Sequence, residues 1–292
     1  MLSLFGQLVF DGLTIGLVYV ILAAGLVFIL SITEILFIAY GQFYMIGAYG
    51  VWYAVNLLHL PYFLSLIVGV IVTAALGILS YILIFRRLHT VEGRFLSNLT
   101  AALGLSMMLS QGGLLVFGTY PRSIPTVFKG SFTELGITFS VDKIALICMG
   151  IGVTVILFWL YERTKIGRAM RAVSYQPEVA SLHGVNANRI YLVAMGLGTG
   201  LAGFAGAIIA PSYGINPQMG NNILLSVLLM TMLGGMDSLL GAVVGGVIVG
   251  LVLSFGQFYI GGLVQIVLFV VIGIIIFFRP AGILGRRADI GV

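Results

Sequence analysis

The sequence predicts an all-α, polytopic integral membrane protein with about eight to nine transmembrane helices. Of its 292 residues, 60% are hydrophobic and only 8% are charged, and the mean hydropathy is +1.17. A soluble domain of this composition would have too little polar surface to cover its core. Apolar runs of about 18 to 25 residues, the length that crosses a bilayer, recur along the chain. These runs lack the short alternating pattern of a membrane β-barrel.

Each expected span is an apolar run bounded by charged or polar residues. In chain order the spans are Leu4–Leu30, Ile35–Leu58, Tyr62–Phe85, Ser97–Gly118, Lys143–Tyr161, Ile190–Ala210, Asn222–Leu233, Leu239–Phe255 and Leu263–Phe278. The first is expected to be a retained span, because the first Lys or Arg is Arg86 and a cleavable signal needs a basic start. The count is eight or nine, since Ile35–Leu58 and the segment from Asn222 to Phe255 could include re-entrant pieces.

Basic residues orient these spans. Eleven of the 14 Lys and Arg fall on one side in this order, namely Arg86, Arg87, Arg94, Arg163, Lys165, Arg168, Arg171, Arg189, Arg279, Arg286 and Arg287. The positive-inside rule makes that side cytosolic, together with the C-terminus and a loop of about residues 162–189. The other three are Arg122, Lys129 and Lys143, so a loop of about residues 119–142 faces outward. The net charge of +5 is therefore attributed to the cytosolic loops. The expected partner of the chain is the lipid bilayer, and no nucleic acid is expected to bind.

The chain contains 40 glycines, and many lie four residues apart on apolar runs. The pairs are Gly12 and Gly16, Gly196 and Gly200, Gly241 and Gly245, and Gly246 and Gly250. Small residues at this spacing let two helix backbones approach closely in lipid. The pattern is compatible with static helix packing and with interfaces that let helices slide.

Ionisable groups are scarce in the expected spans. The only acids in or near them are Asp11, Glu34 and Asp237, and each has a structural and a functional interpretation. The chain has no GxxxxGK[ST], HExxH or GxSxG motif and no Cys/His metal set, and its one cysteine, Cys148, excludes an intrachain disulfide. We therefore expect no enzyme, no metal and no cofactor bound by this chain. Any nucleotide-driven step would take place in another subunit.

A basic segment from Arg163 to Gly184 interrupts the apolar runs. Arg163, Lys165, Arg168 and Arg171 lie within nine positions of it. Ile166–Val173 is expected to form a short helix, and Pro177 to begin a second one that Gly184 ends. Such a segment could lie on anionic lipid, which needs only the arginines, or it could bind a cytosolic partner. The defined start at Pro177 and end at Gly184 favour a cytosolic partner over lipid, because lipid contact would need only the arginines.

Residue motifs along the chain carry a resemblance to a known family. In the basic segment they are Arg163-Thr164, Gly167 to Val173 (GRAMRAV), Pro177-Glu178, Ala180 and Gly184. Further along they are Gly200 to Gly206 (GLAGFAG), Gly234 to Ser238 (GGMDS) with Gly241 and Gly245, and Arg279 to Gly285 (RPAGILG). In order and spacing the chain resembles the permease subunits of the branched-chain amino acid ABC transporter family (LivH type).

The resemblance implies a single transmembrane permease domain, residues 1–292, in the bacterial inner membrane. It also implies that the basic loop is a coupling helix that docks onto a cytosolic ATPase subunit. The residues expected at this contact are Arg163, Gly167, Arg168, Ala169, Met170, Arg171, Ala172, Pro177, Glu178 and Gly184. The further partners implied are a periplasmic substrate-binding protein and a second, similar permease subunit or a second copy of this chain. ATP would be used by the ATPase alone.

Within this coupling segment, the residue types suggest separate roles. Arg168 and Arg171 are expected to contact or steer the ATPase. The small residues Gly167, Ala169 and Ala172 would allow close docking. Pro177 and Gly184 would fix the bend, a role that follows from their backbone preferences.

One motif departs from the family pattern. The family commonly has Asn-Phe-Ala-His-Gly-Glu after the first long span, whereas the run from Phe37 to Gln42 reads Phe-Ile-Ala-Tyr-Gly-Gln. This stretch is expected to lie close to the translocation route, so Tyr40, Gln42 and Tyr44 are candidates for lining it. Because the family's polar groups are missing here, the identity of the substrate stays open. Leucine, isoleucine and valine are the first expectation, and other amino acids, amides and urea-like solutes are the alternatives.

The leading hypothesis is a permease subunit of an ABC importer that moves a small polar solute. One alternative is an autonomous ion-coupled transporter or channel, although no relay of acids or histidines at mid-depth is visible in the sequence. Its histidines, His59, His89 and His183, fall at loop edges. A structural scaffold without a conduit is the third possibility.

Overall fold

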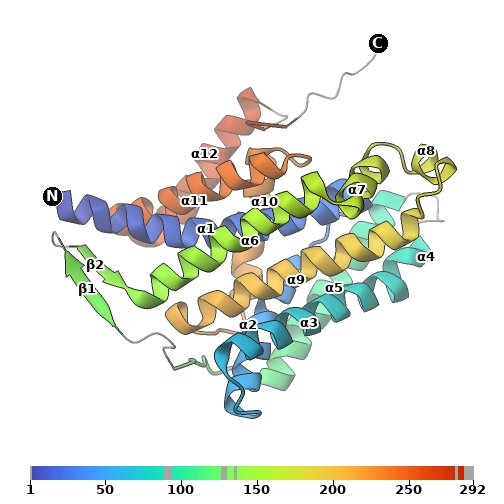
Figure 1. Cartoon of the computed structure of the whole chain (residues 1–292). Helices are drawn as coiled ribbons and strands as arrows, with labels where there is room; N and C mark the ends of the chain where they lie inside the picture. Colours follow the sequence, from blue (N-terminus) through green and yellow to red (C-terminus); the bar gives the residue numbers. More distant parts are fainter. Residues whose placement is uncertain (1, 89–93, 126–129, 135–136, 280–281, 286–292) are drawn as a thin grey trace. The chain divides into compact units, whose positions relative to one another are not determined.

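The structure is a computed structural model that describes residues 2–88, 94–125, 130–134, 137–279 and 282–285 (Figure 1). Its helices are α1 (Leu2–Thr33), α2 (Tyr40–Asn56), α3 (Tyr62–Ser80), α4 (Arg86–Leu88), α5 (Arg94–Phe117), α6 (Val141–Arg163), α7 (Lys165–Tyr175), α8 (Pro177–Leu182), α9 (Ala187–Tyr213), α10 (Met219–Gly234), α11 (Leu239–Ile260) and α12 (Val264–Phe278). A π-helical turn, Tyr81–Phe85, joins α3 to α4, and a 3₁₀ turn, Gly261–Leu263, joins α11 to α12. His89, Lys129, Pro280, Ala281, Arg286 and Arg287 lie outside the described residues.

The helices confirm a multi-pass membrane protein but not the expected number of crossings. Among the described residues, six helical segments are long and apolar enough to cross a bilayer: Ser3–Thr33, Tyr62–Leu88, Phe95–Phe117, Val141–Arg163, Ala187–Tyr213 and Leu239–Phe278. The expected spans at Ile35–Leu58 and Asn222–Leu233 become the shorter helices α2 and α10, of 17 and 16 residues. The segment Leu239–Phe278 contains two expected spans, which the turn at Gly261–Leu263 separates.

The described chain divides into two compact units, each built from segments that are far apart in the sequence. Unit 1 comprises Met1–Val27, Thr126–Thr154 and Ser226–Val292. Unit 2 comprises Phe28–Pro125 and Val155–Leu225. The helices α1, α6 and α10 therefore each contribute one part to each unit.

In unit 1, glycines spaced four apart hold α1 against α11. A Cβ built on Gly12 would lie 3.0 Å from the Leu251 side chain, and one built on Gly16 would lie 3.3 Å from the carbonyl oxygen of Gly246. A Cβ on Gly250 would overlap the backbone of Gly16. The sequence prediction that these glycines allow close approach is confirmed, because no larger side chain fits between the two backbones.

A β-hairpin in the expected outward loop adds strands to the helical fold predicted from sequence. Strands β1 (Ser131–Glu134) and β2 (Ile137–Ser140) are antiparallel, with Phe132 opposite Phe139. The backbone N–H of Thr138 donates to Gln7 Oε1 at 3.0 Å, which attaches the hairpin to the start of α1 (Figure 1). The loop expected over residues 119–142 is also shorter than predicted, since α6 begins at Val141.

Beside this hairpin, Asp11 has a structural explanation. Its carboxylate accepts a hydrogen bond from Lys143 Nζ at 2.6 Å, and both side chains are 27% exposed. The partly exposed ion pair links the start of α1 to the start of α6. The other two acids singled out in the sequence, Glu34 and Asp237, are exposed.

The segment after α12 packs against the C-terminal end of α10 in unit 1. The N–H of Ile283 donates to the carbonyl of Leu233 at 2.8 Å, and the N–H of Leu284 donates to that of Gly234 at 3.2 Å. The last carbonyls of a helix have no partner within the helix, so the tail satisfies them. The Gly234–Ser238 and Arg279–Gly285 motifs, which are separate in the sequence, therefore meet in the structure.

In unit 2, α9 packs against α2 and α3 through residues that leave almost no space. A Cβ on Gly47 would overlap the backbone of Gly203, and a Cβ on Gly206 would overlap the carbonyl of Tyr44. Gly196 makes looser contact, with 3.0 Å from its built Cβ to the Ile78 side chain. These glycines bring the three backbones together, which provides dispersion contacts where lipid supplies no hydrophobic drive.

Buried hydroxyl groups in this interface are satisfied within their own helices. Thr73 Oγ1 donates to the Gly69 carbonyl at 2.9 Å, and Thr199 Oγ1 donates to the Met195 carbonyl at 2.7 Å. Both threonines are fully buried. Their methyl and hydroxyl groups can therefore pack against glycines of the facing helix without leaving an unpaired polar group in the membrane.

Candidate functional site

The basic segment begins at a sharp corner between α6 and α7. Thr164 is the N-cap of α7, and its Oγ1 accepts a hydrogen bond from the Gly167 N–H at 3.0 Å. A Cβ on Gly167 would overlap the carbonyl oxygens of Leu160 and Tyr161. Gly167 is therefore buried in the first turn of α7, where it allows the turn, and does not lie on the exposed face of the helix.

The inner face of α7 fixes the helix to the rest of unit 2. Met170 and Val173 are buried, at 0% and 1% exposure. Ser174 Oγ donates to the carbonyl of Ser31 near the end of α1 at 2.7 Å. Val173 and Ser174 follow Met170 by three and four positions, so one side of this short helix is held by packing and by a hydrogen bond to α1.

Arg171 also faces inward. Its Nη1 donates to the carbonyl of Tyr161, and its Nη2 to that of Glu162 at 3.4 Å. The Arg171 guanidinium lies 5.0 Å from the centroid of the Tyr161 ring, and Nη1 is 3.7 Å from a carboxylate oxygen of Glu162. A cation here satisfies the last carbonyls of α6 and complements the negative end of the helix dipole.

The exposed face of α7 carries the remaining positive charge. Lys165, Arg168, Ala172 and Tyr175 follow one another at intervals of three or four and are all exposed. Arg163, at the end of α6, is exposed as well. Of the two arginines expected to contact or steer the ATPase, Arg168 is thus exposed and Arg171 is used within the protein.

Helix α8 begins and ends at the predicted residues. Pro177 occupies its first position, Glu178 follows in the first turn, and Gly184 has a φ of +81° just beyond its end. The Val185 N–H donates to the Ala180 carbonyl at 3.1 Å and the Gly184 N–H to that of Ser181 at 3.0 Å. These two bonds form a Schellman motif, which requires a left-handed residue and explains the glycine.

Apolar side chains extend the exposed surface along α8. Tyr175, Val179 and Leu182 are 64%, 45% and 85% exposed, whereas Ala180 is buried. We call the outward residues Arg163, Lys165, Arg168, Ala172, Tyr175, Val179 and Leu182 the basic-apolar face. It combines cations with large apolar groups on two ordered helices. Figure 1 shows α7 and α8 toward the same end of unit 2 as α4, which carries Arg86 and Arg87.

The candidate path residues lie at an interruption between α1 and α2. Residues 34–39 are not helical, and Glu34 adopts a φ of +57° at their start. Within this segment Ile35, Phe37 and Ala39 are fully buried. Non-helical backbone at membrane depth is tolerated only where it is enclosed by protein or lines a cavity. Tyr40 and Gln42, at 0% and 1% exposure, occupy the first turn of α2 that follows.

Gln42 belongs to a chain of hydrogen bonds between three helices. Its Nε2 donates to Asn221 Oδ1 on α10 at 2.6 Å, and Asn221 Nδ2 donates to Ser110 Oγ on α5 at 3.3 Å. Sequence reasoning missed Asn221 and Ser110, although two adjacent asparagines at the start of an apolar run were a usable signal. Tyr44, one turn after Tyr40, is buried, and its carbonyl lies against Gly206 of α9 instead.

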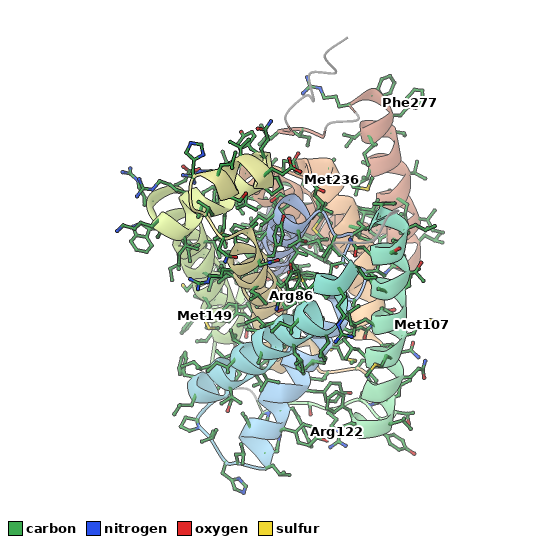
Figure 2. All side chains as sticks on the ribbon, turned by 90° about the vertical axis from the view of Figure 1, so that its right-hand side faces the viewer. Arg86, Met107, Arg122, Met149, Met236 and Phe277 are labelled. Carbon is green, nitrogen blue, oxygen red and sulfur yellow. The ribbon has the colours of Figure 1, made fainter. Side chains whose placement is uncertain are left out.

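An aromatic cluster occupies the other end of α2. The Arg122 guanidinium lies 4.1 Å from the centroid of the Trp52 ring, and its Nη2 donates to the Phe117 carbonyl at 3.1 Å. Tyr49 stacks on Phe117 with 4.0 Å between centroids. Figure 2 shows Arg122 beside the end of α5 and Met107 on the outer side of that helix, where it is 71% exposed. Arg122 thus stabilises the end of α5.

The described part of the chain holds no group of three or more His, Cys, Asp or Glu side chains that could bind a metal ion. The candidate sites among the described residues are the basic-apolar face and the hydrogen-bonded cluster of Gln42, Asn221 and Ser110.

Comparisons with known proteins identify the family of the chain. A family model described as branched-chain amino acid transport system / permease component matches residues 8–278. The high-affinity branched-chain amino acid transport system permease protein BraD of Pseudomonas aeruginosa is 30% identical over 225 residues, which cover 75% of this chain and 73% of BraD. The corresponding protein LivH of Escherichia coli is 28% identical over 197 residues, which cover 64% of this chain and 63% of LivH.

A solved structure shares the fold. PsaBC from Streptococcus pneumoniae in complex with Fab superimposes with a TM-score of 0.53 at 15% sequence identity, over 95% of this chain and 92% of that chain. At this identity the similarity concerns the arrangement of helices alone.

Proposed function

The chain belongs to the family of permease components of branched-chain amino acid transport systems, and we propose that it is the membrane-spanning subunit of an ABC importer. It moves a small polar solute, first of all leucine, isoleucine or valine, across the bacterial inner membrane, and its C-terminus lies in the cytosol. Cytosolic ATPase subunits bind and hydrolyse ATP. A periplasmic binding protein delivers the solute, and a second similar permease subunit, or a second copy of this chain, completes the path.

The observation that carries the proposal is the basic-apolar face of α7 and α8. A loop that only touches anionic lipid needs its cations and no fixed shape. Here the two helices are fixed by the Thr164 cap, Pro177 and the Schellman motif at Gly184. A rigid surface loses little conformational entropy on binding, and exposed groups such as Tyr175 and Leu182 would be covered by the partner. Arg163, Lys165 and Arg168 favour a partner groove with acidic residues.

The attachments of α7 give the proposed docking a mechanical consequence. Arg171 and Gly167 bind α7 to the end of α6, and Ser174 binds it to the end of α1. A displacement of α7 by the ATPase would therefore be transmitted to α6 and α1 without an intervening flexible loop. Small residues between the helices would permit their movement in the transport cycle.

Reconstitution tests the proposal. The complete set of permease, ATPase and binding-protein components in proteoliposomes is expected to take up labelled leucine only when ATP is supplied. Arg168→Glu should lower both uptake and ATPase binding, while the matched control Arg86→Glu, also an exposed arginine on the proposed cytosolic side, should leave both close to wild type. Uptake by this chain alone, driven by an ion gradient, would overturn the proposal in favour of an autonomous carrier.

A further inference from the structure

The first turns of α2 and α10 meet in backbone contact. A Cβ built on Gly220 would lie 2.6 Å from the carbonyl oxygen of Gly41, and a Cβ on Gly41 would overlap the carbonyl of Gly220. The same position on Gly220 is 3.0 Å from Gln42 Oε1. The Gln42 amide is therefore directed at the start of α10. The close approach of the two helices here requires glycine at both positions.

One polar atom at this junction lacks a partner among the described residues. Gln42 Oε1 is buried and accepts no hydrogen bond, whereas Gln42 Nε2 is used by Asn221. A buried acceptor without a donor costs about 1–3 kcal/mol, so the Gln42 oxygen requires a partner such as a water molecule or a ligand. Asn221 is exposed, and through it the junction reaches accessible surface.

The backbone at the junction favours a cation over an anion. Helix starts often bind anions through free N–H groups. Here the N–H of Gln42 donates to the Ala39 carbonyl at 3.0 Å, and those of Asn221 and Asn222 donate to Gln218 at 3.1 and 3.2 Å. Because these N–H groups already donate to carbonyls, few of them are available to bind a carboxylate. A donor group, in contrast, could form a hydrogen bond to the Gln42 oxygen.

We propose that Gln42 Oε1 accepts a hydrogen bond from the ammonium group of the transported amino acid, and that Asn221 holds the Gln42 amide in position for it. This inference rests on the proposed function, since it names the part of the solute that the path recognises. Interrupted helices with a polar site at the break are a common construction in transporters. The proposal predicts that a solute with a free amine is selected over its deaminated acid.

Two substitutions of similar volume separate the oxygen from the amide nitrogen. Gln42→Glu keeps an acceptor and loses the donor to Asn221, whereas Gln42→Met loses both. In the complete reconstituted complex, with labelled leucine as the probe, Gln42→Glu is expected to retain uptake to within about threefold. Gln42→Met is expected to lower uptake about 10- to 100-fold, the factor for one lost hydrogen bond to a charged group. The same changes at Gln218, an exposed glutamine three residues before Asn221, serve as controls and should leave uptake unchanged.

Each other outcome overturns the inference. Equal losses in both Gln42 variants would mean that only the bond to Asn221 matters. Loss in Gln42→Glu with retention in Gln42→Met would mean that the junction holds a carboxylate. Wild-type uptake in both would remove Gln42 from recognition. Copurification with partner subunits and the basal ATPase rate report folding, and a wild-type complex that takes up no amino acid would refute the proposed function instead.

Discussion

Arg171 of α7 donates a hydrogen bond to the main-chain carbonyl of Tyr161 and places its guanidinium over the ring of the same residue. One arginine thus ties the short helix to the end of a long one by charge, hydrogen bonding and packing. Three residues earlier in the same helix, Arg168 is exposed. Two arginines of the same motif therefore have separable roles, the first in holding α7 and the second in the proposed contact with the ATPase.

Replacing each arginine by glutamine should separate these roles. Arg171→Gln is expected to destabilise the permease by about 1–2 kcal/mol, because it removes a cation from a helix C-terminus and from an aromatic ring. Its thermal unfolding midpoint in detergent should fall. Arg168→Gln should leave the midpoint unchanged and weaken ATPase binding in a pull-down. Equal midpoints for the two variants would contradict the internal role of Arg171.

The glycine after α8 offers a test of backbone conformation alone. A Cβ on Gly184 would meet no atom within 4 Å, yet its φ is +81°. Gly184→Ala should therefore cost about 1–2 kcal/mol through left-handed strain, and Gly184→Asn should cost less, since asparagine tolerates this conformation. Protease sensitivity of the α8–α9 connection measures the effect. If alanine and asparagine behaved alike, the Schellman motif would not control this segment.

The contact between α3 and α9 should tolerate no larger side chain. Gly203→Leu is expected to prevent a stable fold, because even a Cβ there would overlap Thr73. Gly104→Leu is the matched control, since a Cβ at Gly104 meets nothing within 4 Å. The amount of monodisperse protein extracted from membranes should fall sharply for the first variant only. A normal yield of Gly203→Leu would show that the α3–α9 interface is more open than described.

Membrane orientation can be tested by cysteine labelling. In a Cys148→Ser background, Lys165→Cys should react with an impermeant maleimide only after cells are permeabilised, and Phe132→Cys should react in intact cells. Lys165 lies on the basic-apolar face and Phe132 on the outward hairpin, and both side chains are exposed. Labelling of residue 165 in intact cells would put α7 out of reach of any cytosolic ATPase and refute the proposed function.

Local sequence signals were sufficient for the helices of the coupling segment. Helix α8 begins at Pro177 and ends just before Gly184 as predicted, since each of these residues acts through its own backbone conformation. Glycine spacing likewise indicated close helix contacts. It could not tell that Gly16 faces Gly250 or that Gly47 faces Gly203, because spacing records a small surface on one helix and not the helix that covers it.

Composition and short-range pattern by themselves determined a multi-pass helical membrane protein with a basic, ordered loop, because hydropathy and turn residues act over a few residues at a time. Tertiary structure alone decided that Arg171 turns inward while Arg168 remains outside. It also decided that Gln42 meets Asn221, 179 residues away in sequence. The physical reason is that side-chain partners depend on how helices cross, and crossing is set by packing between segments that no local pattern relates.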